Sequence, residues 1–223
     1  SQLPAPIYAD FDQLPDNLER LFVIGGGTLI DRAKLWKLNE SRKVELVAIP
    51  SIWGSGAEVS PVAVQNSGSR KEIFVDPNLV PDKACFGPEL ADSVPEALAL
   101  NACGDAWSHA LEGFLSPLTN GSLRSELARV MQAMLELPLA SDGRWFEPSA
   151  QACAGQARSS VGLVHGIAHT LEIRLRDVYP DSGWSHARLC SVFLLPVMEF
   201  NRSQSDKWET LAEKHQLDGH AVF

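Results

Sequence analysis

The residues best suited to chemistry are acids and histidines that recur at helical spacing in the second half of the chain. Asp105 and His109 lie four residues apart in "GDAWSHALEG", and His165 and His169 repeat this spacing in "GLVHGIAHTLE". Residues four apart share one face of a helix, so each pair could bind a single ion from that face. His186, in "DSGWSHARLCSVFLLP", supplies a further nitrogen at the start of another apolar stretch.

The combination of these side chains favours a metal site. A lone histidine on an apolar helix is more often a hydrogen-bonded core residue than a ligand. Burying a carboxylate with several imidazoles is unfavourable, however, unless they are paired or bind a metal. One carboxylate with two or three imidazoles suits Fe²⁺ or Zn²⁺ better than Ca²⁺ or Mg²⁺, which prefer oxygen ligands. This donor set does not distinguish iron from zinc.

Two small-residue loops favour a nucleotide cofactor. Gly25, Gly26 and Gly27 stand between an apolar strand pattern and a helix pattern, where backbone N–H groups and the helix dipole can hold a phosphate. The loop is neither a GxGxxG fingerprint nor a Walker loop, and a tight strand-to-helix turn is the alternative interpretation. A second loop, "PSIWGSGAE" (residues 50–58), follows the next strand. Both would open at the carboxyl edge of one sheet, where open α/β folds bind ligands.

The elements that must position these residues change in kind along the chain. "RLFVIGGG", "TLIDRAKLWKL" and "VELVAIPS" predict strand, helix and strand, which is a βαβ unit with a parallel sheet. Beyond Pro88, helical periodicity predominates, and Asp92 and Ser93 are candidate N-cap residues of the first helix. Helices are predicted in five segments, "VPEALALNACGDAWSHALEGFLS", "NGSLRSELARVMQAMLELP", "SAQACAGQARSSVGLVHGIAHTLEIRL", "HARLCSVFLLPVMEF" and "DKWETLAEKH". We therefore predict a partial α/β dinucleotide-binding domain (1–88) and a partial all-α metal-binding catalytic domain (89–223).

Charge and composition exclude several classes of partner. The 28 acidic and 19 basic residues give a net charge of -9, which would repel nucleic acid and anionic membranes. Because we find neither a signal-peptide pattern nor about 20 consecutive apolar residues, we expect a cytoplasmic location. The four cysteines, at positions 85, 103, 153 and 190, form no CxxC pair, and we expect them to be buried thiols.

Five motifs, taken in order, carry a resemblance to a known family. They are "GGGTLIDRAK", "IPSIWGSGAEVS", "GDAWSHALEG", "GLVHGIAH" and "SHARLCSVFLLPVMEFN". Together they resemble the successive motifs of the iron-containing (group III) alcohol dehydrogenases, which share their fold with dehydroquinate synthase. The chain departs from that pattern at Ser51-Ile52, where the family usually has two threonines, and at Ala187, where it usually has glycine.

The resemblance implies a role for each candidate residue. The metal ligands would be Asp105, His109, His165 and His186, and His169 would stand beside the nicotinamide and the substrate as the catalytic residue. The cofactor, NAD or NADP, would contact seven residues, namely Gly26, Gly27, Thr28, Asp31, Ser51, Ser60 and Lys71. The implied reaction is hydride transfer between this cofactor and a small alcohol or aldehyde, with Fe²⁺ or Zn²⁺ polarising the substrate oxygen.

Several points stay open at this stage. A lyase or cyclase similar to dehydroquinate synthase would use the same cleft, and a non-catalytic remnant of the family would keep the helices without the reaction. The resemblance allows a homodimer without deciding the oligomeric state. Family members have a further strand-helix-strand portion before the glycine loop and more helices after the last histidine. We therefore expect this chain to be a fragment or a shortened member.

Overall fold

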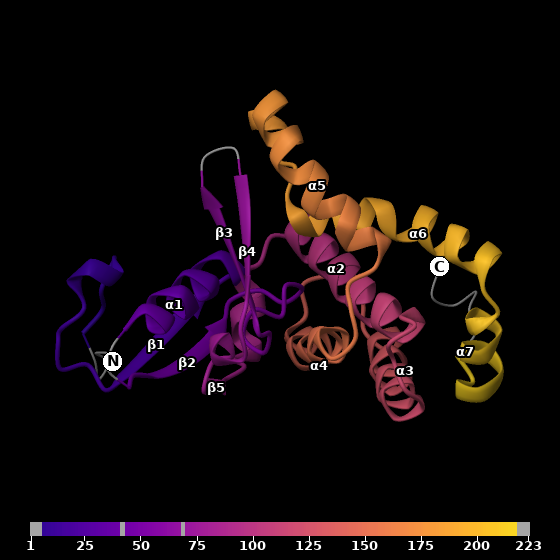
Figure 1. Ribbon diagram of the computed structural model, residues 1–223, viewed down its shortest axis with the longest axis horizontal. Helices are drawn as coiled ribbons and strands as arrows, with labels where there is room; N and C mark the ends of the chain where they lie inside the picture. Colours follow the sequence, from indigo (N-terminus) through magenta and orange to yellow (C-terminus); the bar gives the residue numbers. More distant parts are fainter. Residues whose placement is uncertain (1–5, 41–42, 68–69, 218–223) are drawn as a thin grey trace.

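The computed structural model describes residues 6–40, 43–67 and 70–217. Its strands all fall between residues 20 and 84 of the described chain, and the long helices after α1 follow from residue 96 onward (Figure 1). Short 3-10 helices occupy Phe11–Gln13, Pro77–Leu79, Pro88–Ser93, Gly143–Trp145 and Pro180–Ser182. The predicted fold class, a parallel sheet followed by a helical region, is confirmed.

The sheet is built from a βαβ unit. Strands β1 (Arg20–Gly25), β2 (Glu45–Pro50) and β5 (Lys83–Ala84) are parallel and lie in the order β1-β2-β5. Helix α1 (Gly27–Asn39) joins β1 to β2 and buries Ile30 and Ala33 against Val23, Leu46 and Ala48. These apolar positions fix the register, in which Val23 lies beside Ala48 and Gly25 beside Pro50. The carboxyl ends of β1 and β2 therefore meet at one edge of the sheet.

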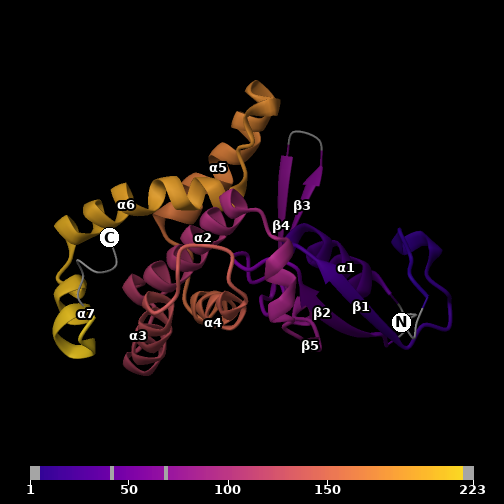
Figure 2. The same cartoon turned by 180° about the vertical axis from the view of Figure 1, so that it is seen from behind.

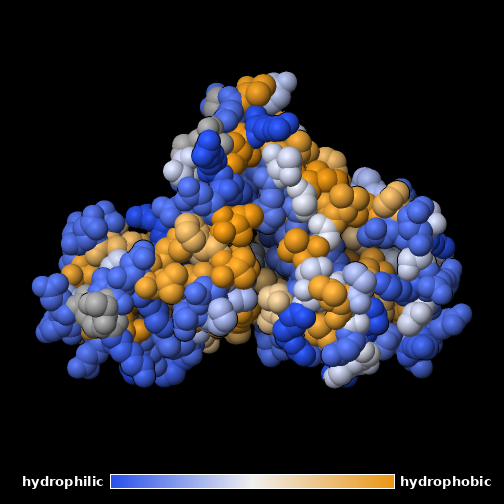
Figure 3. Space-filling view, viewed as in Figure 1, coloured by the Kyte–Doolittle hydropathy of each residue, from blue (hydrophilic) through white to orange (hydrophobic). Residues whose placement is uncertain are grey.

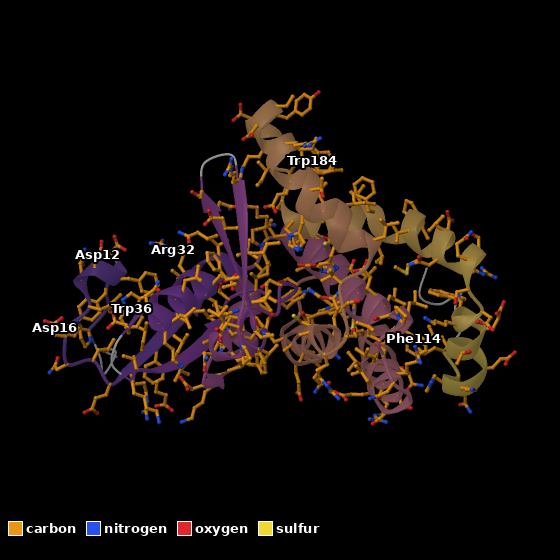
Figure 4. All side chains as sticks on the ribbon, viewed as in Figure 1. Asp12, Asp16, Arg32, Trp36, Phe114 and Trp184 are labelled. Atoms are coloured by element: carbon orange, nitrogen blue, oxygen red, sulfur yellow. The ribbon has the colours of Figure 1, made fainter. Side chains whose placement is uncertain are left out.

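The start of the described chain packs on the outer side of α1. The rings of Phe11 and Trp36 stack with their centroids 6.1 Å apart, and the Arg32 guanidinium lies 5.4 Å from the Phe11 centroid. Figure 4 shows Arg32 and Trp36 on this helix, with Asp12 and Asp16 on the segment beyond it. These two contacts attach the start of the described chain to α1.

A hairpin that the sequence did not predict follows the second loop. Strands β3 (Val62–Ser67) and β4 (Arg70–Val75) are antiparallel and form a separate two-stranded sheet. Buried polar groups of α1 anchor the hairpin, since Asp31 Oδ2 accepts from the Val64 N–H at 3.0 Å and Lys34 Nζ donates to the Val62 carbonyl. In Figures 1 and 2 the hairpin rises between α1 and α5, and β4 contacts α5.

The helical region is organised around one buried helix. Helix α2 (Glu96–Leu115) packs against α4 (Phe146–Ala157) and α6 (His186–Gln204), while α3 (Gly121–Leu135) packs against α2 and α4. Helix α5 (Leu163–Val178) lies on α6, and α7 (Lys207–His215), the last helix of the described chain, lies beside α3 (Figure 2). Leu111, Phe114, Leu127, Met131 and Trp145 are fully buried in this core. Within the described ranges, none of the helices combines the length and apolar character needed to cross a bilayer.

Three local predictions were wrong. The segment predicted as one helix over residues 149–175 is two helices, because the chain turns between Ala157 and Leu163. The first long helix begins at Glu96 after Pro95 and has no side-chain cap, so neither Asp92 nor Ser93 is its N-cap. Of the four cysteines, three are buried thiols as expected, whereas Cys85 is exposed.

Candidate active site

The glycine loop places the N-terminus of α1 at the carboxyl edge of the sheet. Gly26 is the N-cap residue, and no side chain caps this end of the helix. A Cβ added to Gly27 would lie 2.5 Å from Ser55 Oγ in the second loop, so a larger residue would force the Ser55 side chain to move at this close approach of the two loops. The backbone N–H groups at this helix end can receive an anion such as a phosphate.

The second loop folds back against the helical region. Gly54 and Gly56 adopt positive φ angles of 104° and 61°, which other residues rarely adopt. The Gly54 N–H donates to Ser149 Oγ at 2.8 Å, and the Cys153 thiol donates to the carbonyl oxygens of Ser55 and Gly56. These contacts hold the sheet edge against α4.

A cleft of about 560 Å³ lies between the sheet edge and the helices. Figure 3 shows the surface hollowed between the strand-containing lobe and the helical lobe. Five of the seven predicted cofactor residues line the cleft, namely Gly27, Thr28, Asp31, Ser60 and Lys71. Gly26 and Ser51 lie beside it, and the Ser51 N–H donates to the Gly25 carbonyl at 3.0 Å.

Two of the cleft-lining charges already have partners. Asp31 Oδ1 accepts from Lys34 Nζ at 3.0 Å, and its Oδ2 accepts from the Val64 N–H. Both carboxylate oxygens are therefore already used in hydrogen bonds that stabilise the fold. Lys71 Nζ, on β4, donates to Glu172 Oε2 on α5. A coenzyme phosphate approaching Lys71 would have to share it with this carboxylate.

The acid and histidine side chains meet at the helical wall of the same cleft. Helix α2 supplies Asp105 and His109, α5 supplies His165 and His169, and α6 supplies His186. His165 is at the centre, because its Nε2 lies 3.6 Å from Asp105 Oδ1 and 3.1 Å from His109 Nε2. The rings of His169 and His186 stack at 4.4 Å between centroids. All five side chains that the spacing singled out are therefore brought together.

Several buried polar atoms of this cluster lack hydrogen-bond partners in the part of the chain that the structure describes. Among the described residues, four of its buried atoms have no hydrogen-bond partner, namely Asp105 Oδ1, His109 Nδ1, His169 Nδ1 and His186 Nδ1. Burial is the main cause that lowers the pKa of His109 to about 4 and that of His169 to about 4; His165 adds to the shift at His109, and Lys71 and His165 add to it at His169. Burial likewise lowers the pKa of His186 well below its usual value. The imidazoles of His109, His169 and His186 are therefore neutral at pH 7 and have nitrogen lone pairs available to a cation.

The donor set fits a divalent transition metal. Buried carboxylates normally have partners, so a buried Asp105 oxygen without a hydrogen-bond partner in the described chain, among imidazole nitrogens, is the pattern expected of a cation-binding site. One oxygen and several nitrogens suit Fe²⁺ or Zn²⁺. The donor atoms of Asp105, His165 and His186 lie within 4.8 Å of one another, together with the sulfur of Cys190. This group of four does not include His109, which contacts it through His165.

Three residues of the site were missed by the sequence interpretation. Glu112, one turn beyond His109, contacts His165; Glu172, near the middle of α5, pairs with Lys71; and Cys190 lies one turn beyond His186. The i,i+4 spacing from His186 to Cys190 was a usable signal for the cysteine. The two glutamates act through partners far away in the sequence, and only the fold shows them.

The tryptophans near the cleft have mainly structural contacts. Trp53 lines the cleft and packs edge-on against Phe146, with ring centroids 5.6 Å apart. The Arg188 guanidinium stacks over Trp184, 4.4 Å from the ring centroid, and Figure 4 shows this tryptophan beside α5. Trp107, on α2, is buried in the hydrophobic core of the helical region. Only Trp53 among these three lines the cleft.

The fold and the site define a class of protein in which a parallel α/β sheet and a helical histidine-rich region face each other across one cleft. Residues 16–88 match the family model "Iron-containing alcohol dehydrogenase". The chain is 32% identical over 163 residues to 1-propanol dehydrogenase of Salmonella typhimurium, covering 66% of this chain and 44% of that protein. It is 34% identical over 138 residues to lactaldehyde reductase of Escherichia coli, covering 57% of this chain and 36% of that protein.

The structural comparison agrees with the sequence comparison. The iron-containing alcohol dehydrogenase of Thermococcus thioreducens superposes with a TM-score of 0.75 at 24% identity, over 90% of this chain and 60% of that one. The chain thus spans less than half the length of the two curated relatives and about three fifths of this structure. By the family match over residues 16–88, by the relatives that extend it and by the common fold, the chain is similar to the iron-containing alcohol dehydrogenases.

Proposed function

We propose that this cleft catalyses hydride transfer between a nicotinamide coenzyme and a small alcohol or aldehyde. In this proposal residues 1–88 form the coenzyme-binding part and residues 89–223 the metal-binding part. The observation that carries it is that one cleft is lined both by the uncapped N-terminus of α1 and by the acid and histidine cluster. The names of the two curated relatives support small alcohols and aldehydes as the class of substrate.

In this proposal, one group of cleft residues binds the coenzyme and another group binds the cation. The backbone at Gly27 and Thr28 binds the coenzyme phosphates, and Lys71 adds a positive charge. Asp105, His165 and His186 hold the divalent cation, with His109 beside them. When bound, the cation supplies a Lewis acid for the substrate oxygen, and the coenzyme supplies or accepts the hydride.

His169 is suited to handling the proton. It lines the cleft one turn after His165, and its Nδ1 has no hydrogen-bond partner within the described chain. As a neutral imidazole it carries a proton on one ring nitrogen and accepts at the other, so it can pass a proton between the substrate hydroxyl and solvent. The apolar walls from Ile52, Trp53 and Leu98 limit the water that reaches this end of the cleft.

The test is turnover by the purified protein loaded with Fe²⁺ or Zn²⁺. We expect NADH or NADPH to be oxidised in the presence of propanal or lactaldehyde, measured as loss of nicotinamide absorbance. Asp105→Ala should abolish both metal binding and turnover, whereas Asp12→Ala, at an exposed position, should change neither. Metal binding with no turnover of any short aldehyde or alcohol would overturn the dehydrogenase proposal and leave a lyase or a non-catalytic metal protein.

A further inference from the structure

Cys190 occupies a position in the cluster that the proposed function does not use. It follows His186 by one turn of α6, so both side chains lie on the same face of that helix. Its sulfur is fully buried and lies 3.6 Å from His186 Nε2. The side chain therefore reaches the same buried space as the histidines.

The separations between donor atoms match a shared ion. With metal bonds of about 2.0 Å to nitrogen and oxygen and about 2.3 Å to sulfur, tetrahedral geometry puts neighbouring donors about 3.3 to 3.6 Å apart. Cys190 Sγ is 3.6 Å from His186 Nε2, and Asp105 Oδ1 is 3.6 Å from His165 Nε2. All four donors lie within 4.8 Å of one another, so small side-chain adjustments suffice to complete a shell.

The environment of Cys190 differs from that of a purely structural thiol in the same protein. The buried Cys153 thiol donates to two backbone carbonyl oxygens, those of Ser55 and Gly56, which accounts for its placement. Cys190 instead faces an imidazole and the carboxylate of Asp105, whose Oδ1 lacks a hydrogen-bond partner in the described structure although the residue is only 1% exposed. A thiol packed for its apolar character would not need these polar neighbours.

We propose that Cys190 is a ligand of the metal centre, completing a set with Asp105, His165 and His186. The inference rests on the proposed metal-binding function of the cleft. On binding, the S–H bond breaks, the sulfur keeps the electron pair that it donates to the cation, and the proton leaves to solvent. Thiolate is a preferred ligand of zinc. Because catalytic zinc centres can expand from four to five ligands, a Cys190 ligand still leaves the cation able to bind a substrate oxygen.

The experiment uses Co²⁺ as a spectroscopic substitute in the metal-free protein. We expect stoichiometric Co²⁺ to give visible d–d bands together with a near-ultraviolet sulfur-to-cobalt charge-transfer band. Cys190→Ser should lose the charge-transfer band and bind Co²⁺ at least about tenfold more weakly. Cys103→Ser, which removes a buried thiol of α2 outside the cluster, should keep the band.

A second variant keeps the proposal testable if Cys190→Ser does not fold. When the other three cysteines are replaced by serine, only Cys190 remains, and the charge-transfer band must persist. Co²⁺ bound with d–d bands but without the sulfur band in the unmodified protein would overturn the role of Cys190 while leaving the proposed metal centre intact. An unmodified protein that binds no Co²⁺ would overturn the metal centre itself and this inference with it.

Discussion

Glu112 Oε2 lies 2.6 Å from His165 Nδ1, and both side chains are almost completely buried. The same carboxylate accepts the backbone N–H groups of Gly162 and Val164, so it also fixes the start of α5. Since a carboxylate can only accept, His165 carries its proton on Nδ1 and presents the Nε2 lone pair to Asp105 and His109. Glu112 thus orients the His165 ring, with Nε2 directed towards Asp105 and His109.

Weakening this contact should weaken metal binding. In Glu112→Gln the side chain keeps its shape but loses the charge that orients the imidazole, and we expect Zn²⁺ affinity to fall about 10- to 100-fold. Competition with a chromophoric chelator measures the change. Glu126→Gln removes an exposed carboxylate paired with Arg158 and should leave the affinity unchanged. Equal affinities for the two variants would show that Glu112 serves only the fold.

The ion pair between Lys71 and Glu172 should compete with the coenzyme. Both side chains are largely buried at the contact between β4 and α5, and Lys71 is a proposed coenzyme contact. Glu172→Gln frees the ammonium group, so we expect NADH or NADPH to bind about two- to fivefold more tightly, the equivalent of roughly 0.5–1 kcal/mol. Lys71→Met should bind the coenzyme more weakly than the unmodified protein.

Fluorescence titration of the reduced coenzyme measures these affinities. Glu147→Gln is the matched control, because it removes the same charge from an exposed position on α4. A coenzyme affinity that falls in Glu172→Gln would contradict the competition and would mean that the pair holds Lys71 in its binding position.

Some features of the fold and of the candidate site could be predicted from the sequence alone, and others could not. The βαβ unit and the acid and histidine pairs were predictable because their signals are local: apolar runs, glycines and i,i+4 spacing. The hairpin was missed because most of its side chains are exposed or half-buried, so neither strand shows a strong apolar pattern, and its anchors Asp31 and Lys34 lie on α1. The break before α5 depends on Glu112, a residue of another helix. Such tertiary contacts leave no trace in local periodicity.

The turn at Gly56 should tolerate no side chain. Its φ is 61°, and a Cβ there would overlap the Cβ and sulfur of Cys153. We expect Gly56→Ala to lower the free energy of unfolding by about 3 kcal/mol or more, since backbone strain and overpacking add. Gly121→Ala, in the first turn of α3 with no heavy atom within 4 Å of the new methyl group, should be neutral or slightly stabilising. Urea denaturation of both variants measures the difference, and similar losses at the two positions would contradict this account.

Glu58 should make the protein less stable as pH rises. Burial raises the pKa of this carboxyl from 4.5 to about 7, against the opposing effect of Lys34. Between these two values the unfolded chain has released the proton while the folded chain retains it, so the free energy of unfolding falls as pH increases. The stabilising contribution of protonated Glu58 to the free energy of unfolding is fully present below about pH 4.5 and is lost as pH passes 7. The total loss is on the order of 3 kcal/mol.

Glu58→Gln isolates this effect, because the amide cannot ionise. The buried histidines have the opposite effect between about pH 4 and 6.5, where they make the free energy of unfolding rise with pH. In this range the imidazoles bind protons in the unfolded chain but not in the folded chain. The informative quantity is therefore the difference between Glu58→Gln and the unmodified protein, both metal-free, in urea denaturation at pH 5 and pH 8. We expect the variant to gain stability relative to the unmodified protein at pH 8 but not at pH 5, with Glu19→Gln, at an exposed position, showing no such change. An identical pH dependence in the unmodified protein and Glu58→Gln would mean that Glu58 is ionised in the folded state at neutral pH.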